Sequence, residues 1–144
     1  MKRYRFGRHL LGSRSLFAAG AITAGALVAL AFEQGVPPAL AWAALASFLL
    51  PLFAAAWSPR KLFVWGFIGG TTAFAIYLRW FFAILPLNWV GIETSPAIVG
   101  VVALTLLLAA AGLGLFFGLL FLVVRFFSKG SVWRTALALL VLWP

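Results

Sequence analysis

The side chains that could do chemistry in this sequence are few and widely separated. Cysteine is absent, so the chain can supply no thiolate nucleophile, disulfide or thiolate ligand. The single histidine, His9, lies in a basic N-terminal stretch, far along the chain from the two acidic residues, Glu33 and Glu93. A nucleophile needs a neighbouring base, and a metal ion needs several ligands close together. The sequence therefore predicts no catalytic residue, no cofactor and no metal site in these residues.

One polar cluster suggests a binding role. Arg79 directly precedes Trp80 and Phe81, and Glu93 follows in the same predicted loop. A guanidinium group matches the geometry of a phosphate, and tryptophan favours the headgroup level of a membrane. Arg79, Trp80 and Phe81 are therefore the candidate lipid-facing residues at the outer interface. The alternative is that Arg79 only extends its charge to water beside an aromatic belt. Glu33 is predicted to be a solvated loop residue.

The elements that must position this cluster are membrane helices. Of the 144 residues, 65% are hydrophobic and 9% are charged, whereas soluble domains are about 45–50% apolar and about 25% charged. This composition excludes a soluble globular protein and a disordered chain, and it predicts an all-α, polytopic transmembrane helical bundle. The net charge of +9 does not indicate nucleic acid, because the basic residues flank apolar runs.

The chain has two parts: a basic head, residues 1–14, followed by one transmembrane domain, residues 15–144, which contains the apolar runs. A helix needs about 20 apolar residues to cross a bilayer. The sequence predicts four full spans and a truncated fifth, and the predicted ranges are 15–32, 39–57, 62–78, 97–124 and 135–144. The apolar stretch 80–90 is too short to cross, which favours an interfacial or re-entrant segment.

Charge flanking these spans predicts the topology. Every Lys and Arg except Arg79 lies in the head or in the second or fourth loop. By the positive-inside rule the N-terminus is cytoplasmic, and Glu33, Arg79 and Glu93 face outward. The tryptophans follow the same division, with Trp57, Trp65 and Trp133 expected inside and Trp80 and Trp89 outside. The first span is interpreted as a retained helix, although Ala29-Leu30-Ala31 also suits signal-peptide cleavage.

Small residues recur at the spacing that lets membrane helices approach closely. They occur as Gly66-x-x-x-Gly70 in the third run and as Ala110-x-x-x-Gly114-x-x-x-Gly118 in the fourth. We expect these faces to pack against neighbouring helices.

Several short motifs follow one another along the chain: GALVALAF at 25–32, AWAAL at 41–45, LLPL at 49–52, GFIGG at 66–70 and WFF at 80–82. A Pro-bearing first loop, a basic second loop and Trp133-Arg134 accompany them. In this order the motifs resemble the opening of bacterial apolipoprotein N-acyltransferases, and the resemblance covers roughly residues 20–144. The sequence departs from the family at Glu33-Gln34, where a Phe-Pro-Pro turn is commoner.

The resemblance implies a function in lipoprotein biosynthesis in the bacterial inner membrane. Family members move an acyl chain from a phospholipid, through an enzyme thioester, to the N-terminal amine of a lipid-modified cysteine on an apolipoprotein. Their catalytic Glu, Lys and Cys lie in a nitrilase-like domain that follows the membrane helices, and none of the three matches a position in this sequence. The implied partners are therefore membrane phospholipids and, through that domain, an apolipoprotein.

The fifth run stops at Pro144 without a polar flank, which favours an N-terminal fragment of a longer protein. Two alternatives remain beside this interpretation. A complete small polytopic protein with a structural or transport role needs no further domain. A membrane anchor of a different enzyme is the other alternative. The fragment alone is expected to be inactive.

Overall fold

The computed structural model describes residues 6–33, 35–54, 56–86, 91, 95–129 and 131–142, with the backbone alone at 6–13 and 142. No strand occurs in this part of the chain. Its helical elements are α1 (Phe6–Ala31), α2 (Pro38–Leu49), η1 (Leu50–Phe53), α3 (Pro59–Tyr77), η2 (Leu78–Ile84), α4 (Pro96–Ser128) and α5 (Val132–Leu142). The prediction of an all-α fold is confirmed for these residues.

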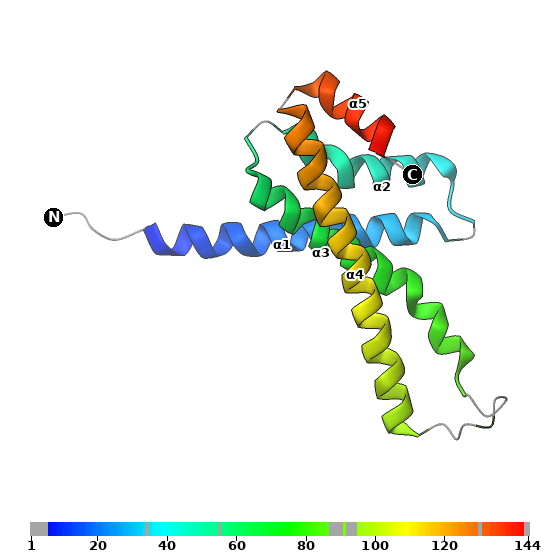
Figure 1. Cartoon of the computed structure of the whole chain (residues 1–144). Coiled ribbons are helices and arrows are strands. Elements are labelled where there is room, and N and C mark those ends of the chain that lie inside the picture. Colours follow the sequence, from blue (N-terminus) through cyan, green and yellow to red (C-terminus); the bar gives the residue numbers. More distant parts are fainter. Residues whose placement is uncertain are drawn as a thin grey trace.

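The helices form two hairpins that cross. Helices α1 and α2 lie side by side, and the α3–α4 pair crosses them (Figure 1). The most extensive packing joins α3 to α4, and the next joins α3 to α1. Helix α5 turns back from the end of α4 and contacts η1. Helix α3 is therefore the central element, with a different neighbour on each of two faces.

Serine–proline pairs start the two helices of the second hairpin. The Oγ atom of Ser58 accepts a hydrogen bond from the Lys61 backbone N–H at 3.4 Å. The Oγ atom of Ser95 accepts one from the Ile98 N–H at the same distance. Proline follows each serine at the first helical position, where its missing N–H costs nothing. Helix α3 consequently begins earlier than the predicted residue 62.

Three helices are long and apolar enough to cross a membrane among the residues described. They cover Arg14–Ala31, Pro59–Ile84 and Pro96–Ser128, with 18, 26 and 33 residues. The first helix also extends backward to Phe6, into the segment assigned to the basic head. Helix α4 is about 50 Å long at about 1.5 Å per residue, so it exceeds the hydrocarbon thickness.

The expected second span, 39–57, does not form one continuous helix. Helix α2 ends at Leu49 and the short 3-10 helix η1 ends at Phe53. Pro51 is the physical reason, because it lacks a backbone N–H and its ring collides with the preceding helical turn. The last run likewise gives only the short helix α5. The full count of four spans and a fifth is thus not confirmed.

The small-residue faces predicted from spacing do pack against each other. A Cβ atom built on Gly66 would lie 2.8 Å from the Phe117 carbonyl oxygen. One built on Gly114 would lie 2.7 Å from the Thr71 nitrogen and 2.8 Å from the Phe67 oxygen. These contacts are with backbone atoms, which cannot easily move aside. The glycines thus bring the backbones of α3 and α4 together, as expected in lipid.

A second close approach joins α1 to α3 and was missed by the sequence analysis. A Cβ atom on Gly25 would lie 2.1 Å from the Gly69 carbonyl oxygen. A Cβ atom on Gly69 would meet the Ala21 oxygen at 3.1 Å and a Phe48 ring carbon at 2.5 Å. The spacing Ala21-x-x-x-Gly25 is the signal that identifies this face.

Large buried side chains gather toward the turns that carry the basic residues. The core cluster brings together residues from α1, α2, η1, α3 and α4, namely Ala24, Phe48, Leu52, Leu62, Leu120, Phe121 and Val124. Beside it, the Trp65 indole N–H donates a 3.0 Å hydrogen bond to the Phe48 carbonyl. The Trp65 ring also packs on Trp57 and Phe17, with ring centroids 5.3 and 5.6 Å away. Both tryptophans are half-buried, so their rings pack against the interior and also form part of the surface.

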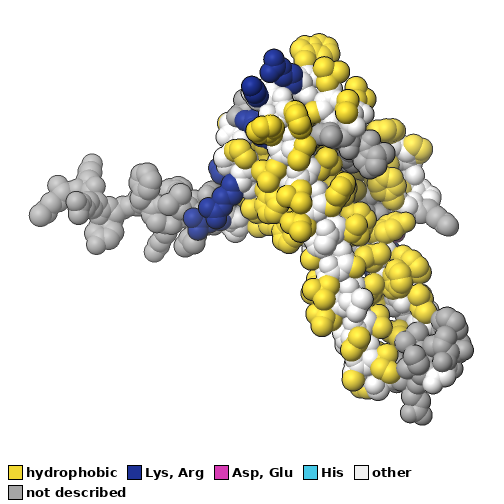
Figure 2. All heavy atoms as spheres, viewed as in Figure 1, with side chains coloured by type: hydrophobic (Ala, Val, Ile, Leu, Met, Phe, Trp, Pro, Cys, Tyr) yellow, Lys and Arg dark blue, Asp and Glu magenta, His cyan; other side chains and the backbone are white. Residues whose placement is uncertain are grey.

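The exposed surface of the molecule is largely apolar, which suits an apolar environment. Figure 2 shows hydrophobic side chains over most of the visible face, including the projecting part of the α3–α4 pair, while Lys and Arg gather at one end. Exposed large side chains line α4, including Val101, Leu104, Leu107 and Leu108. Apolar exposure of this extent is typical of a lipid-facing surface.

Candidate functional site

The three candidate residues lie together on η2, which continues α3. The Trp80 and Phe81 rings stack on each other, with centroids 4.1 Å apart and planes 29° apart. Trp80 is exposed, at 52%, while Phe81 is half-buried. The described part of the expected segment 80–90 is thus a 3-10 helix as far as Ile84. Trp89 and Glu93 lie outside the described residues.

Arg79 makes an ion pair that no pattern in the sequence predicts. One of its terminal nitrogens donates a hydrogen bond to the Glu33 carboxylate, across 46 positions of the chain. Glu33 follows the end of α1, so the pair ties the first loop to η2. The prediction that Glu33 is a solvated loop residue is confirmed, and the ion pair is an additional feature. Charge counting places both residues on the same side of the membrane, and the pair is consistent with that.

The ion pair is open to water rather than buried. The side chain of Arg79 is 60% exposed and that of Glu33 is 41% exposed. Exposed pairs contribute only about 0–1 kcal/mol, because water screens the charges and both side chains lose freedom. Neither group is therefore held tightly in this pairing, and either can exchange its partner.

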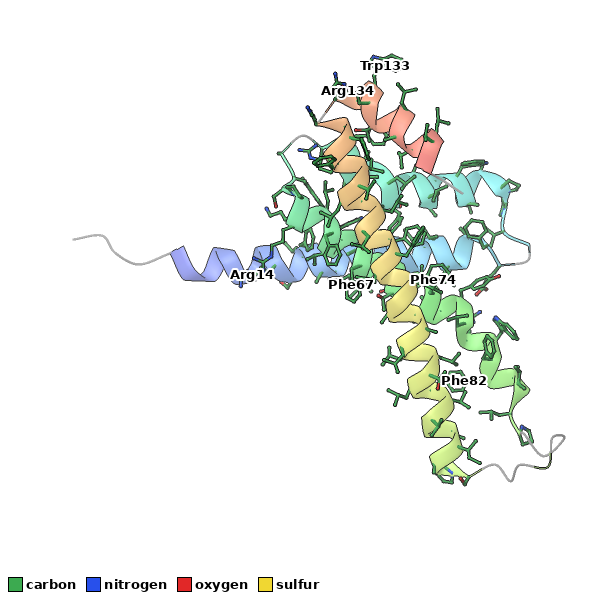
Figure 3. The ribbon with its side chains drawn as sticks, in the orientation of Figure 1. Arg14, Phe67, Phe74, Phe82, Trp133 and Arg134 are labelled. Atoms are coloured by element: carbon green, nitrogen blue, oxygen red, sulfur yellow. The ribbon has the colours of Figure 1, made fainter. Side chains whose placement is uncertain are left out.

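An apolar cavity of about 470 Å³ lies beneath the pair, between the two hairpins. Its walls come from α1, α2, α3 and α4, and Phe74, labelled in Figure 3, is one of the lining residues. The lining consists of Val28, Ala29, Phe32, Leu45, Phe48, Gly70, Ala73, Phe74, Tyr77 and Phe117. Only Tyr77 among these brings a polar side-chain atom. The size falls in the range of about 300–1,000 Å³ that is usual for ligand sites.

The chain order places the ion pair at the rim of this cavity. Phe32 lines the cavity and directly precedes Glu33, while Tyr77 lines it from α3, two residues before Arg79. Phe32 and Tyr77 are also exposed, at 64% and 56%. Two walls of the cavity therefore end at the two charges, and the cavity meets the surface beside them.

This arrangement suits binding rather than bond chemistry. The walls offer apolar contact, and the rim offers a guanidinium group and two stacked aromatic rings. Among the described residues, neither the cavity nor its rim presents a nucleophile with an adjacent base. Within the described residues no three metal-ligating side chains lie together. The arrangement fits an elongated apolar ligand with an anionic head.

The sequence indicates the rim but not the cavity. Arg79 stands out because every other Lys and Arg lies in the head or in the second or fourth loop. The cavity depends on how two hairpins cross and on residues such as Leu45 and Phe117, which look like ordinary apolar positions. No local pattern distinguishes them. The opposed small residues Gly25 and Gly69, which fix one side of the crossing, are the available clue.

Comparison with known proteins provides no relative. No protein-family model, no curated protein and no solved structure matches the chain.

Proposed function

We propose that this chain is the N-terminal membrane region of an apolipoprotein N-acyltransferase. Two independent lines support the proposal: the ordered motifs of the sequence, and a cavity suited to a lipid chain. The observation that carries it is the apolar cavity whose rim holds Arg79 and Glu33. A membrane region serving acyl transfer from phospholipid needs such a place for the donor.

In this proposal the cavity binds an acyl chain of a membrane phospholipid. The apolar walls replace the lipid environment of the chain, and Arg79 binds the headgroup phosphate through its forked N–H donors. Trp80 and Phe81 lie at headgroup level, where aromatic rings are favoured. Together these three residues form the floor beneath the catalytic domain.

Bond formation in this proposal belongs to residues beyond these 144. Acyl transfer through a thioester needs a cysteine, and this sequence has none. The apolipoprotein acceptor would accordingly meet a nitrilase-like domain rather than these helices. The purified chain should form no thioester with a phospholipid donor, and acylation of this chain alone would contradict the assignment.

The proposal also commits to a topology in a bacterial inner membrane. Helices α1, α3 and α4 cross it, α2 with η1 makes a fourth, short crossing, and α5 begins a fifth. Local thinning of the bilayer accommodates a short span at modest cost. The N-terminus is cytoplasmic, so the ion pair faces outward. Reporter tags inserted at Gly35 and at Ser131 should report opposite compartments, and the same compartment for both would refute the topology.

Activity of the full-length enzyme tests the role of the rim. We expect Arg79→Ala and Trp80→Ala to lower acyl transfer and to change its dependence on donor lipid. Arg60→Ala and Trp133→Ala are matched controls, because both residues are exposed and lie at the other end of α3 and on α5. Unchanged turnover and lipid dependence in both rim variants would contradict the proposed role.

The reading frame after Pro144 separates this proposal from its rivals. We expect an open frame that leads to a domain with Glu, Lys and Cys in nitrilase-like order. A stop codon would favour a complete small membrane protein, and a different domain would favour the anchor of another enzyme.

A further inference from the structure

We infer that Glu33 acts as a built-in competitor of the lipid phosphate for Arg79, so that their ion pair occupies the Arg79 guanidinium group when no lipid is bound. This inference rests on the proposed lipid-binding function and adds a step to it. The Arg79–Glu33 pair is called the rim latch below. Loading the cavity replaces the Glu33 carboxylate with a phosphate on the same guanidinium group.

The position of the latch supports this role. Its two residues lie next to two different walls of the cavity, since Phe32 and Tyr77 line it and each lies within two residues of a latch residue. The pair is therefore a non-covalent link across the rim. Releasing it frees the end of α1 from η2 without disturbing the Gly25–Gly69 contact nearer the middle of both helices.

The chemistry of the pair permits exchange. Both side chains are exposed, at 60% and 41%, so neither charge is stranded in an apolar setting when the pair opens. A phosphate offers charge-assisted hydrogen bonds to guanidinium at least as good as those of a carboxylate. An exposed pair gives up only a small stabilisation, so a phosphate anchored by its chain in the cavity can displace Glu33.

The charge distribution makes Glu33 the specific competitor. Among the described residues it is the sole carboxylate side chain, so no second acid there substitutes for it. The basic residues at the opposite end of α3 and α4 are Arg60 and Lys61 in the first turn of α3, Lys129 directly after α4, and Arg134 in the first turn of α5. Within the described part of the chain, removing the Glu33 charge therefore changes the environment of the Arg79 guanidinium group alone.

Lipid binding by the detergent-solubilised full chain tests the latch. Two fluorescent probes with the same labelled chain are titrated: lysophosphatidylglycerol, which carries a phosphate, and a monoacylglycerol, which does not. We expect Glu33→Gln to bind the phosphate probe roughly two- to fivefold more tightly, the range set by an exposed ion pair. Its affinity for the uncharged probe should stay unchanged, which also shows that the cavity is intact.

Two further variants complete the test. Arg79→Gln should abolish the preference for the phosphate probe, and adding Glu33→Gln to it should give no further gain. Ala73→Leu, which places extra atoms in the cavity, should weaken both probes. If Ala73→Leu weakens both while Glu33→Gln leaves the phosphate probe unchanged or weaker, the latch is refuted and the pocket stands. If Ala73→Leu changes neither probe, the proposed lipid pocket fails and the latch with it.

Discussion

The two halves of α3 serve different purposes. Toward its start, Leu62 is fully buried and Gly66 lies against the backbone of α4. Toward its end, Ala73, Phe74 and Tyr77 line a cavity, and the helix continues into exposed η2. One half is thus packed to exclude space and the other is left open. A rigid half that fixes the helix is what allows the open half to keep a defined shape for a ligand.

The strongest test of this contrast is to disrupt the α3–α4 contact at the middle of α3, where the packed half meets the open half. Gly114→Val would place atoms where a Cβ alone already lies 2.7 Å from the Thr71 nitrogen. Because the obstacle is backbone, we expect α3 and α4 to separate, with a loss of about 4 kcal/mol or more. Reversible unfolding in mixed micelles measures the free energy of unfolding.

The matched control lies on the same helix. Gly112 has no atom within 4 Å of a built Cβ, so Gly112→Val should leave the free energy of unfolding nearly unchanged. Equal losses for the two variants would show that helix propensity, rather than the close approach, determines the effect.

Deleting one aromatic ring from each half makes the comparison quantitative. Phe121 is fully buried in the core cluster, so Phe121→Ala should cost about 3 kcal/mol through lost contacts and a new void. Phe74 already borders an open space, so Phe74→Ala should cost about half as much. Unfolding of both variants is measured in the same micelles, and a larger loss for Phe74→Ala would reverse our view of the two halves.

The sequence predicted the packed half better than the open half. Small residues at i and i+4 carry their own signal, so the spacing of Gly66, Gly70 and Gly114 identified the α3–α4 contact. Apolar length gave the long helices, although Pro51 cut the second one short. The cavity and the Glu33–Arg79 pair could not be predicted from the sequence, because they depend on the crossing of two hairpins, which no local pattern encodes.

A smaller effect is expected at the hydrogen bond that joins α3 to α2. Trp65→Phe keeps the aromatic contacts but removes the donor to the Phe48 carbonyl. The unsatisfied carbonyl should lower the free energy of unfolding by about 1 kcal/mol. Trp133→Phe, at an 81% exposed position, provides the control and should have no effect. A Trp65→Phe variant as stable as the wild type would show that the carbonyl needs no partner.

The smallest effect on stability belongs to the rim latch. A double-mutant cycle of Glu33→Gln and Arg79→Gln should give a coupling of about 0.2–1 kcal/mol, because both side chains are well exposed. A coupling this small would sharpen the comparison of the two halves of α3. The charges beside the open half would then contribute to ligand binding and little to the free energy of unfolding. A coupling of several kcal/mol would instead make the pair a structural element.

Photo-crosslinking from the acyl chain of a phospholipid tests most directly whether the open half of α3 binds lipid. A phospholipid with a photoactivatable group in its acyl chain is reconstituted with the chain in bilayers, irradiated, and the modified residues are identified. We predict preferential labelling of Ala73, Phe74 and Leu45, and loss of that labelling in Ala73→Leu. Labelling confined to the exposed face of α4, at Leu104 and Leu108, with none in the cavity, would contradict the account.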